Sequence, residues 1–87
     1  MKPTPWCVYI IECKNNALYT GITNNIQQRY TAHCEGCGSK YTRAFGVKKL
    51  VYTERTEDKS SALRKEAMIK RLTREQKVEL IKRKNKL

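Results

Sequence analysis

The chain has 87 residues, 31% of them charged, and 19 lysines and arginines against 8 acidic residues give a net charge of +11. A length below about 100 residues predicts a single domain over residues 1–87, with a core over 5–81 and a basic tail over 82–87. No apolar run approaches the ~20 residues that span a membrane, and no secretory signal is visible. We therefore expect a cytoplasmic protein with no membrane partner.

The first two elements should form a hairpin. Residues 6–13 are rich in aromatic and β-branched side chains, which predicts a strand. Period-two alternation places Cys7, Tyr9, Ile11 and Cys13 on one face and Trp6, Val8, Ile10 and Glu12 on the other. A turn over residues 14–16 leads to a second strand over 17–22. So short a connection requires the two strands to be antiparallel.

A helix and a third strand should follow. Residues 23–25 offer N-cap oxygens for a helix that ends near Cys34, before Gly36 and Gly38. Residues 39–44 form a short basic segment with room for one helical turn. The third strand is expected over 47–54, with Leu50 and Val51 on opposite faces.

Two helices should complete the chain. Asp58 or Ser60 can cap a helix over 61–72, and residues 73–76 match a capping box that opens a last helix. Residues 82–86 should fray. The expected order is β-β-α-β-α-α, an α/β (α+β) fold with a small three-stranded, mainly antiparallel sheet flanked by helices.

The positive charge is concentrated in the second half, where residues 47–87 carry 14 basic and 6 acidic residues. Such a surface gains from counterion release on a polyanion, so it favours nucleic acid as the partner. Membrane-surface binding and simple solubility are the competing explanations. The side chains expected to contact the nucleic acid are Lys40, Arg43, Lys48, Lys70 and Arg71.

The spacing of Cys34 and Cys37 is typical of zinc ligands, which raises the possibility of a zinc site formed by all four cysteines. If residues 6–13 form one strand, Cys7 and Cys13 lie roughly 20 Å apart, too far for both sulfurs to bind one ion. In a reducing cytosol we expect four free thiols. A regulatory or incidental disulfide between Cys34 and Cys37 is the alternative.

Several polar residues admit two interpretations. Tyr9 and Tyr19 could be packing aromatics or catalytic phenols. Arg29 and His33 are helical i, i+4 neighbours, which fits either a solvated basic face or a polar cluster with a proton-transfer histidine.

Glu66 presents the same choice on the helix expected over 61–72. It falls on the stripe of Ala62, Leu63 and Ile69, and an inward carboxylate is costly without a cation or metal. Alternatively, it stands at the edge of the stripe and pairs with Lys70 at i+4.

Taken together, these residues resemble the active site of the GIY-YIG nuclease superfamily in order and spacing. The residues that carry the resemblance are Tyr9, Tyr19, Gly21, Arg29, His33 and Glu66. It extends over about residues 5–81. The segments 41–43 and 67–72 are most similar to the small single-domain bacterial UPF0213 (YhbQ-like) subgroup.

The resemblance implies a GIY-YIG fold and a DNA endonuclease acting in DNA repair or recombination. It implies that Glu66 ligates Mg²⁺ or Mn²⁺, that Tyr9 or Tyr19 activates or orients the attacking water, and that Arg29 braces the phosphate. His33 would orient a tyrosine or carry a proton. With no second domain to select a target, a protein partner would supply that choice.

Two positions depart from the family pattern. Ile22 stands where several family nucleases have lysine, and the family's late asparagine is matched only by Asn85, since Val78 falls near the expected place. These departures favour a catalytically weak or inactive nucleic-acid-binding module as the rival function. A protein-interaction adaptor, charged only for solubility, is the third.

Overall fold

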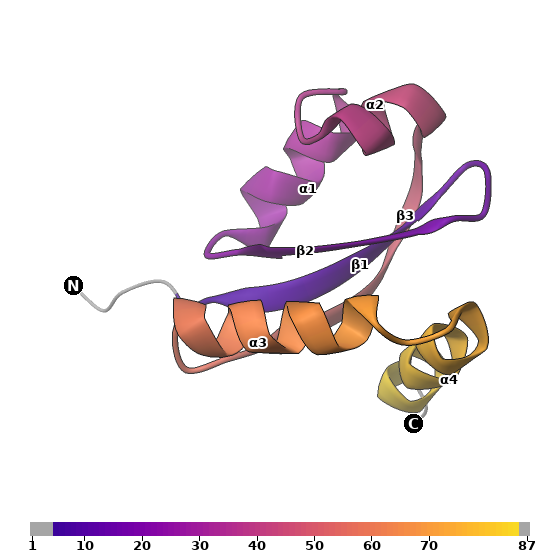
Figure 1. The fold of residues 1–87 in the computed structure, drawn as a ribbon. Helices are drawn as coiled ribbons and strands as arrows, with labels where there is room; N and C mark the ends of the chain where they lie inside the picture. Colours follow the sequence, from indigo (N-terminus) through magenta and orange to yellow (C-terminus); the bar gives the residue numbers. More distant parts are fainter. Residues whose placement is uncertain (1–4, 86–87) are drawn as a thin grey trace.

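The computed structural model describes residues 5–85, which form a three-stranded antiparallel sheet with two helices on each face (Figure 1). The elements are β1 (Cys7–Cys13), β2 (Leu18–Thr23), α1 (Ile26–Cys34), α2 (Lys40–Phe45), β3 (Val47–Arg55), α3 (Lys59–Lys70) and α4 (Arg74–Asn85). The α+β class and the order of the strands are confirmed. The segment expected to hold one helical turn is a separate helix, α2.

β1 is the central strand and is covered on both faces. The strand order is β2-β1-β3, and β1 pairs antiparallel with both neighbours. Tyr9 and Ile11 point into the cluster under α1, while Val8 and Ile10 point into the cluster that includes Ile69 of α3. Because neither face meets solvent, the strand is apolar almost throughout. The predicted alternation is confirmed.

The hairpin turn fixes which residues of β1 and β2 oppose each other. Asn16 adopts a left-handed backbone with φ 69°, and the Cys13 amide donates to the Ala17 carbonyl over 2.9 Å. Asparagine tolerates this conformation better than most residues. The resulting register places Gly21 directly across from Tyr9.

Capping groups determine where the helices begin. Asn25 caps α1 by accepting from the Gln28 amide, and Asp58, rather than Ser60, caps α3 by accepting from the Ser61 amide. These bonds satisfy amides that have no partner within the helix. The predicted capping box is also confirmed, since Thr73 and Gln76 exchange hydrogen bonds of 2.9 and 3.2 Å.

The expectation of a frayed basic tail is wrong over residues 82–85, because α4 continues through Asn85. Leu80 and Ile81 pack against the core, and Glu79 pairs with Arg83 one turn later at 3.6 Å. Residues 86–87 of the expected tail, and residues 1–4 at the other end of the expected domain, lie outside the described part of the chain.

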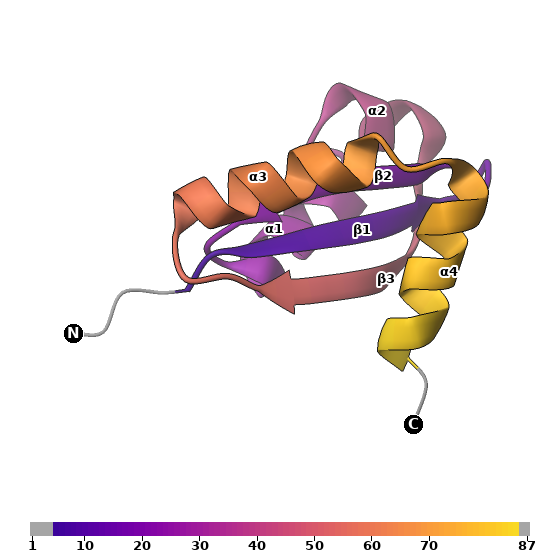
Figure 2. The same cartoon turned by 60° about the horizontal axis from the view of Figure 1, so that its bottom comes forward.

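The helices divide between the two faces of the sheet (Figure 2). α1 and α2 lie on one face, α3 runs along β1 and β2 on the other, and α4 contacts β3 on the side of α3. Within residues 5–85, no helix is long and apolar enough to cross a membrane. β2 forms one edge of the sheet, so side chains from both layers can meet there.

Candidate active site

Tyr9 is buried in the middle of β1, with 1% of its surface exposed, and its ring lies over the backbone of β2. A Cβ added at Gly21 would lie 2.5 Å from the Tyr9 hydroxyl oxygen and 2.7 Å from Cζ. No side chain fits in that space. Glycine is therefore required at position 21 for close approach of the tyrosine rather than for an unusual backbone angle.

The Tyr9 hydroxyl begins a buried chain of hydrogen bonds. Tyr9 Oη lies 2.9 Å from His33 Nε2, and His33 Nδ1 lies 2.7 Å from Thr42 Oγ1. Thr42 Oγ1 is in turn 2.9 Å from Ser39 Oγ. β1, α1 and α2 are thus connected through polar side chains within the core.

His33 is held in its neutral form at neutral pH. Burial, with a smaller contribution from the Arg29 charge, lowers the pKa of His33 below its ordinary value. A neutral imidazole has one donor and one acceptor nitrogen. The two ring nitrogens of His33 therefore take opposite roles, one donating and the other accepting, in the contacts with Tyr9 Oη and Thr42 Oγ1.

Arg29 reaches the same cluster from α1. One terminal nitrogen donates to the Gly38 carbonyl over 2.8 Å, and its buried Nε has no hydrogen-bond partner among the described residues. Burial raises the pKa of Tyr9, and the neighbouring Arg29 guanidinium opposes part of this rise. Arg29 therefore places its positive charge beside the tyrosine and keeps an unpaired, buried donor at Nε.

Tyr19 lies next to Tyr9 but is partly open to solvent. Its ring centroid is 5.3 Å from that of His33 in an edge-on contact and 6.5 Å from that of Tyr9. On its other side it stacks with Tyr41 of α2. Of the two tyrosines expected at the site, Tyr19 is the one that an incoming molecule can touch.

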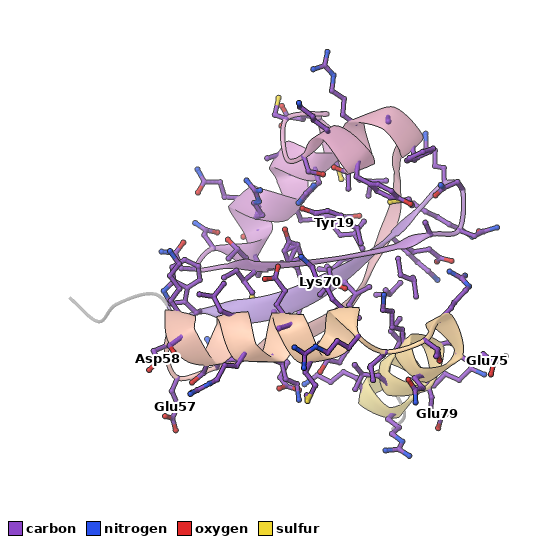
Figure 3. All side chains as sticks on the ribbon, in the orientation of Figure 1. Tyr19, Glu57, Asp58, Lys70, Glu75 and Glu79 are labelled. Carbon is purple, nitrogen blue, oxygen red and sulfur yellow. The ribbon has the colours of Figure 1, made fainter. Side chains whose placement is uncertain are left out.

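Glu66 approaches the cluster from α3, on the opposite face of the sheet. Its side chain is only 19% exposed and pairs with Lys70 at 3.4 Å. Its charge also contributes to the raised pKa of Tyr9. Glu66 therefore points inward and pairs with Lys70 at the same time. Figure 3 shows Tyr19 and Lys70 on the two sides of β2.

Glu66 is the carboxylate available to a metal ion at this site. Residues 5–85 contain no group of three or more histidine, cysteine or acidic side chains that could enclose an ion. The four cysteines are unpaired, with Cys7 and Cys13 buried and Cys34 and Cys37 exposed, as expected for free thiols. Mg²⁺ is commonly held by one or two carboxylates, water and substrate phosphates, so a lone carboxylate fits it better than zinc.

The five basic residues expected to bind nucleic acid are all exposed. Lys40 and Arg43 of α2 line a shallow hollow with Ser39, and Lys70 lines another beside Tyr19. Lys48 lies on β3 and Arg71 directly follows α3. Among residues 5–85, no side-chain hydrogen bond or ion pair connects these last two to the Tyr9–His33 cluster.

A sequence model of the GIY-YIG catalytic domain matches residues 5–79. The chain belongs to the GIY-YIG family. It is 54% identical over 78 residues to a UPF0213 protein of Clostridium perfringens, covering 90% of this chain and 84% of that relative. It is 44% identical over 78 residues to the UPF0213 protein YhbQ of Escherichia coli, covering 90% and 78%.

A solved structure is also similar. The solution NMR structure of a UPF0213 protein from Bacillus halodurans matches with a TM-score of 0.61 and 40% identity, covering 93% of this chain and 86% of that one. The expected resemblance to the GIY-YIG superfamily and to its UPF0213 subgroup is confirmed. Membership of the GIY-YIG family supports a nuclease-type function with nucleic acid as the substrate class.

Three further residues of this cluster are not among the predicted site residues. Thr42 and Ser39 complete the hydrogen-bond chain, and a Cβ at Gly38 would strike the His33 ring. The sequence indicates Gly38 only as a helix breaker. The spacing of Ser39 and Thr42 is the sequence signal for this arrangement. A serine three residues before a threonine can cap a short helix and turn the threonine inward.

Thr42→Val should lower the free energy of unfolding by about 1–3 kcal/mol, because valine keeps the shape but leaves buried His33 Nδ1 without its partner. Thr42→Ser retains the hydroxyl and is the matched control. Urea denaturation measures both. The chain has a single histidine, so its NMR signal reports the ring environment directly. Equal stability of the two variants would contradict the hydrogen-bond chain.

Proposed function

We propose that this chain is a divalent-metal-dependent endonuclease that hydrolyses phosphodiester bonds in DNA, with a role in DNA repair or recombination. The supporting observation is the convergence on the Tyr9 hydroxyl. His33 bonds to it from α1, the Arg29 guanidinium lies beside it, and the charge of Glu66 reaches it from the opposite face. Two helices far apart in the sequence, α1 and α3, thus direct polar groups to one point on β1.

Glu66 would hold the metal ion, Mg²⁺ or Mn²⁺. Among residues 5–85, its mostly buried carboxylate has only the more exposed Lys70 as an ion-pair partner, so one side chain can move away to admit a cation. When bound, the ion would polarise the scissile phosphate and stabilise the leaving oxygen.

The two tyrosines would have different roles. Tyr19, partly exposed, would contact and orient the attacking water. Tyr9 is buried and bonded to His33, and it would act as a positioning residue. Its ring would hold Tyr19 and Arg29, which lie beside it, in place at the bottom of the site. Because burial and the Arg29 charge lower the pKa of His33, the neutral ring adds no second positive charge to this part of the site.

Arg29 would brace the phosphate. Its bond to the Gly38 carbonyl fixes the guanidinium, while Nε retains an unused donor inside the site. A planar guanidinium can offer two parallel donors to a phosphate as negative charge develops, which an ammonium group cannot do.

The test is cleavage of a labelled branched or single-stranded DNA. Wild type should cut in Mg²⁺, stop in chelator and recover when Mg²⁺ is restored. Arg29→Lys should cut at least about tenfold more slowly, because lysine keeps the positive charge but cannot offer two parallel donors to the phosphate. Arg74→Lys, on the exposed start of α4, is the matched control and should cut like wild type. Cleavage that persists in chelator, or an unchanged cleavage rate in Arg29→Lys, would contradict the proposal.

A nucleic-acid-binding module without turnover is the second candidate. Ile22 packs in the cluster of Val8 and Ile69 on the α3 side, so the position after Gly21 supplies no cation. The side chain of Asn85 lies outside the described residues. Under this candidate the same assay shows DNA binding without cutting. For either function, affinity should fall steeply as salt rises.

A further inference from the structure

Beside the candidate active site, α2 presents an aromatic surface to solvent. Tyr41 and Phe45 lie one turn apart, 40% and 45% exposed, with ring centroids 4.8 Å apart. Tyr41 also stacks on Tyr19, at 6.2 Å and an interplanar angle of 20°. The three rings form a continuous row, the aromatic row, that extends from the site to the surface.

The aromatic row borders a hollow of about 230 Å³ that is lined partly by cations. Tyr19 and Tyr41 form part of its wall, and Lys70 of α3 and Lys77 of α4 form another part. This volume is smaller than a typical pocket for a drug-sized ligand, about 300–1,000 Å³, and suits one flat ring system. Thr20 also lines the hollow, and its hydroxyl is buried without a hydrogen-bond partner among the described residues.

The charge around the aromatic row favours an anionic partner. Lys40 and Arg43 lie on the same short helix as the exposed rings. Four of the acidic side chains, Glu57, Asp58, Glu75 and Glu79, lie away from Tyr19, at the far end of α3 and on the outer part of α4 (Figure 3). Proteins that bind single-stranded nucleic acid combine exposed aromatic rings, on which the bases stack, with cations that contact the phosphates.

We propose that the aromatic row, with Lys70 and Lys77, binds an unpaired nucleobase next to the scissile phosphate. The proposal rests on the nuclease function and specifies its substrate class: DNA with unpaired nucleotides, such as single strands, flaps or loops. A duplex keeps both faces of each base covered by its neighbours, so it offers the rings nothing to stack on. Recognition by stacking tolerates any base, because every base has a π face.

The experiment measures binding in chelator, so that its result does not depend on cleavage. Labelled 12-mers, single-stranded and duplex, are titrated with wild type, Tyr41→Leu, Phe45→Leu and the double variant. Leu63→Ala, an exposed apolar residue of α3, is the matched control. The double variant should bind the single strand about tenfold or more weakly. Its affinity for the duplex, and the affinity of Leu63→Ala for both DNAs, should change less than twofold.

A second measurement locates the base. Single strands that each carry one abasic position should show a weak point at one or two adjacent positions with wild type, and none with the double variant. An equal loss for single strand and duplex, or no loss at all, would overturn the proposal, and so would preferred binding of an acidic peptide. Failure of Mg²⁺-dependent cutting with stacking intact would reject the nuclease function alone.

Discussion

Glu66→Gln should reduce Mg²⁺-dependent cleavage by roughly 10³-fold while leaving affinity for DNA within about twofold. The amide keeps the shape of the side chain but removes the charge that would hold a hard cation. The pair with Lys70 is lost as well, but the Lys70 side chain is 57% exposed, so little stability depends on it. The loss should therefore appear in the rate of cutting and not in the fold.

Glu79→Gln is the matched control for this substitution. Glu79 makes the same kind of i, i+4 pair with Arg83, but on the exposed face of α4. Its variant should cut within about twofold of wild type, as expected for an exposed ion pair. Equal residual cutting by both variants would assign the activity to a contaminant and remove Glu66 as the metal ligand. A higher Mg²⁺ requirement in Glu66→Gln alone would support the assignment.

The architecture was predictable because its signals are local. Alternation along β1 separates Tyr9 from Val8 whatever the rest of the chain does, and a turn of three residues permits only an antiparallel partner. For Glu66 the spacing to Ile69 left an inward position and an edge position paired with Lys70 both open, and the structure combines the two. Periodicity within one element carried these predictions, so they needed no knowledge of the neighbours.

The hydrogen-bond chain could not be derived in this way. Thr42 meets His33 because α2 folds back across the end of α1, and a six-residue helix has too few turns to display a periodic pattern. The different exposure of Tyr9 and Tyr19 also depends on contacts between elements, so the pattern within one strand does not predict it. Both alternate to one face, and only the register across to Gly21 shows which ring is covered.

The structure of the basic tail also depended on distant contacts. A run of lysine and arginine favours fraying when it is considered alone. The two apolar residues before it, Leu80 and Ile81, pack against the sheet and stabilise the turns that follow. The charge run therefore forms the last turn of α4 rather than a loose end.

Gly21→Ala should lower the free energy of unfolding by about 1–3 kcal/mol, the usual effect of overpacking a filled core. In a chain of this size each kcal/mol lowers Tm by roughly 4–8 °C. The new methyl group would meet the Tyr9 hydroxyl at 2.5 Å, and Tyr9 cannot move away because His33 and the sheet enclose it. Cleavage should fall with stability, since the bottom of the site is displaced.

A double-mutant cycle separates this collision from other effects of alanine. In a strand, alanine is otherwise preferred over glycine by about 0.5–1 kcal/mol, so without the collision the substitution would stabilise the protein. In a Tyr9→Leu background the ring is absent, and Gly21→Ala should then be neutral or stabilising. The coupling between the two positions should therefore exceed about 1 kcal/mol, as for residues in direct contact. Additive losses would mean that position 21 requires glycine for its backbone, and that the tyrosine is not the reason.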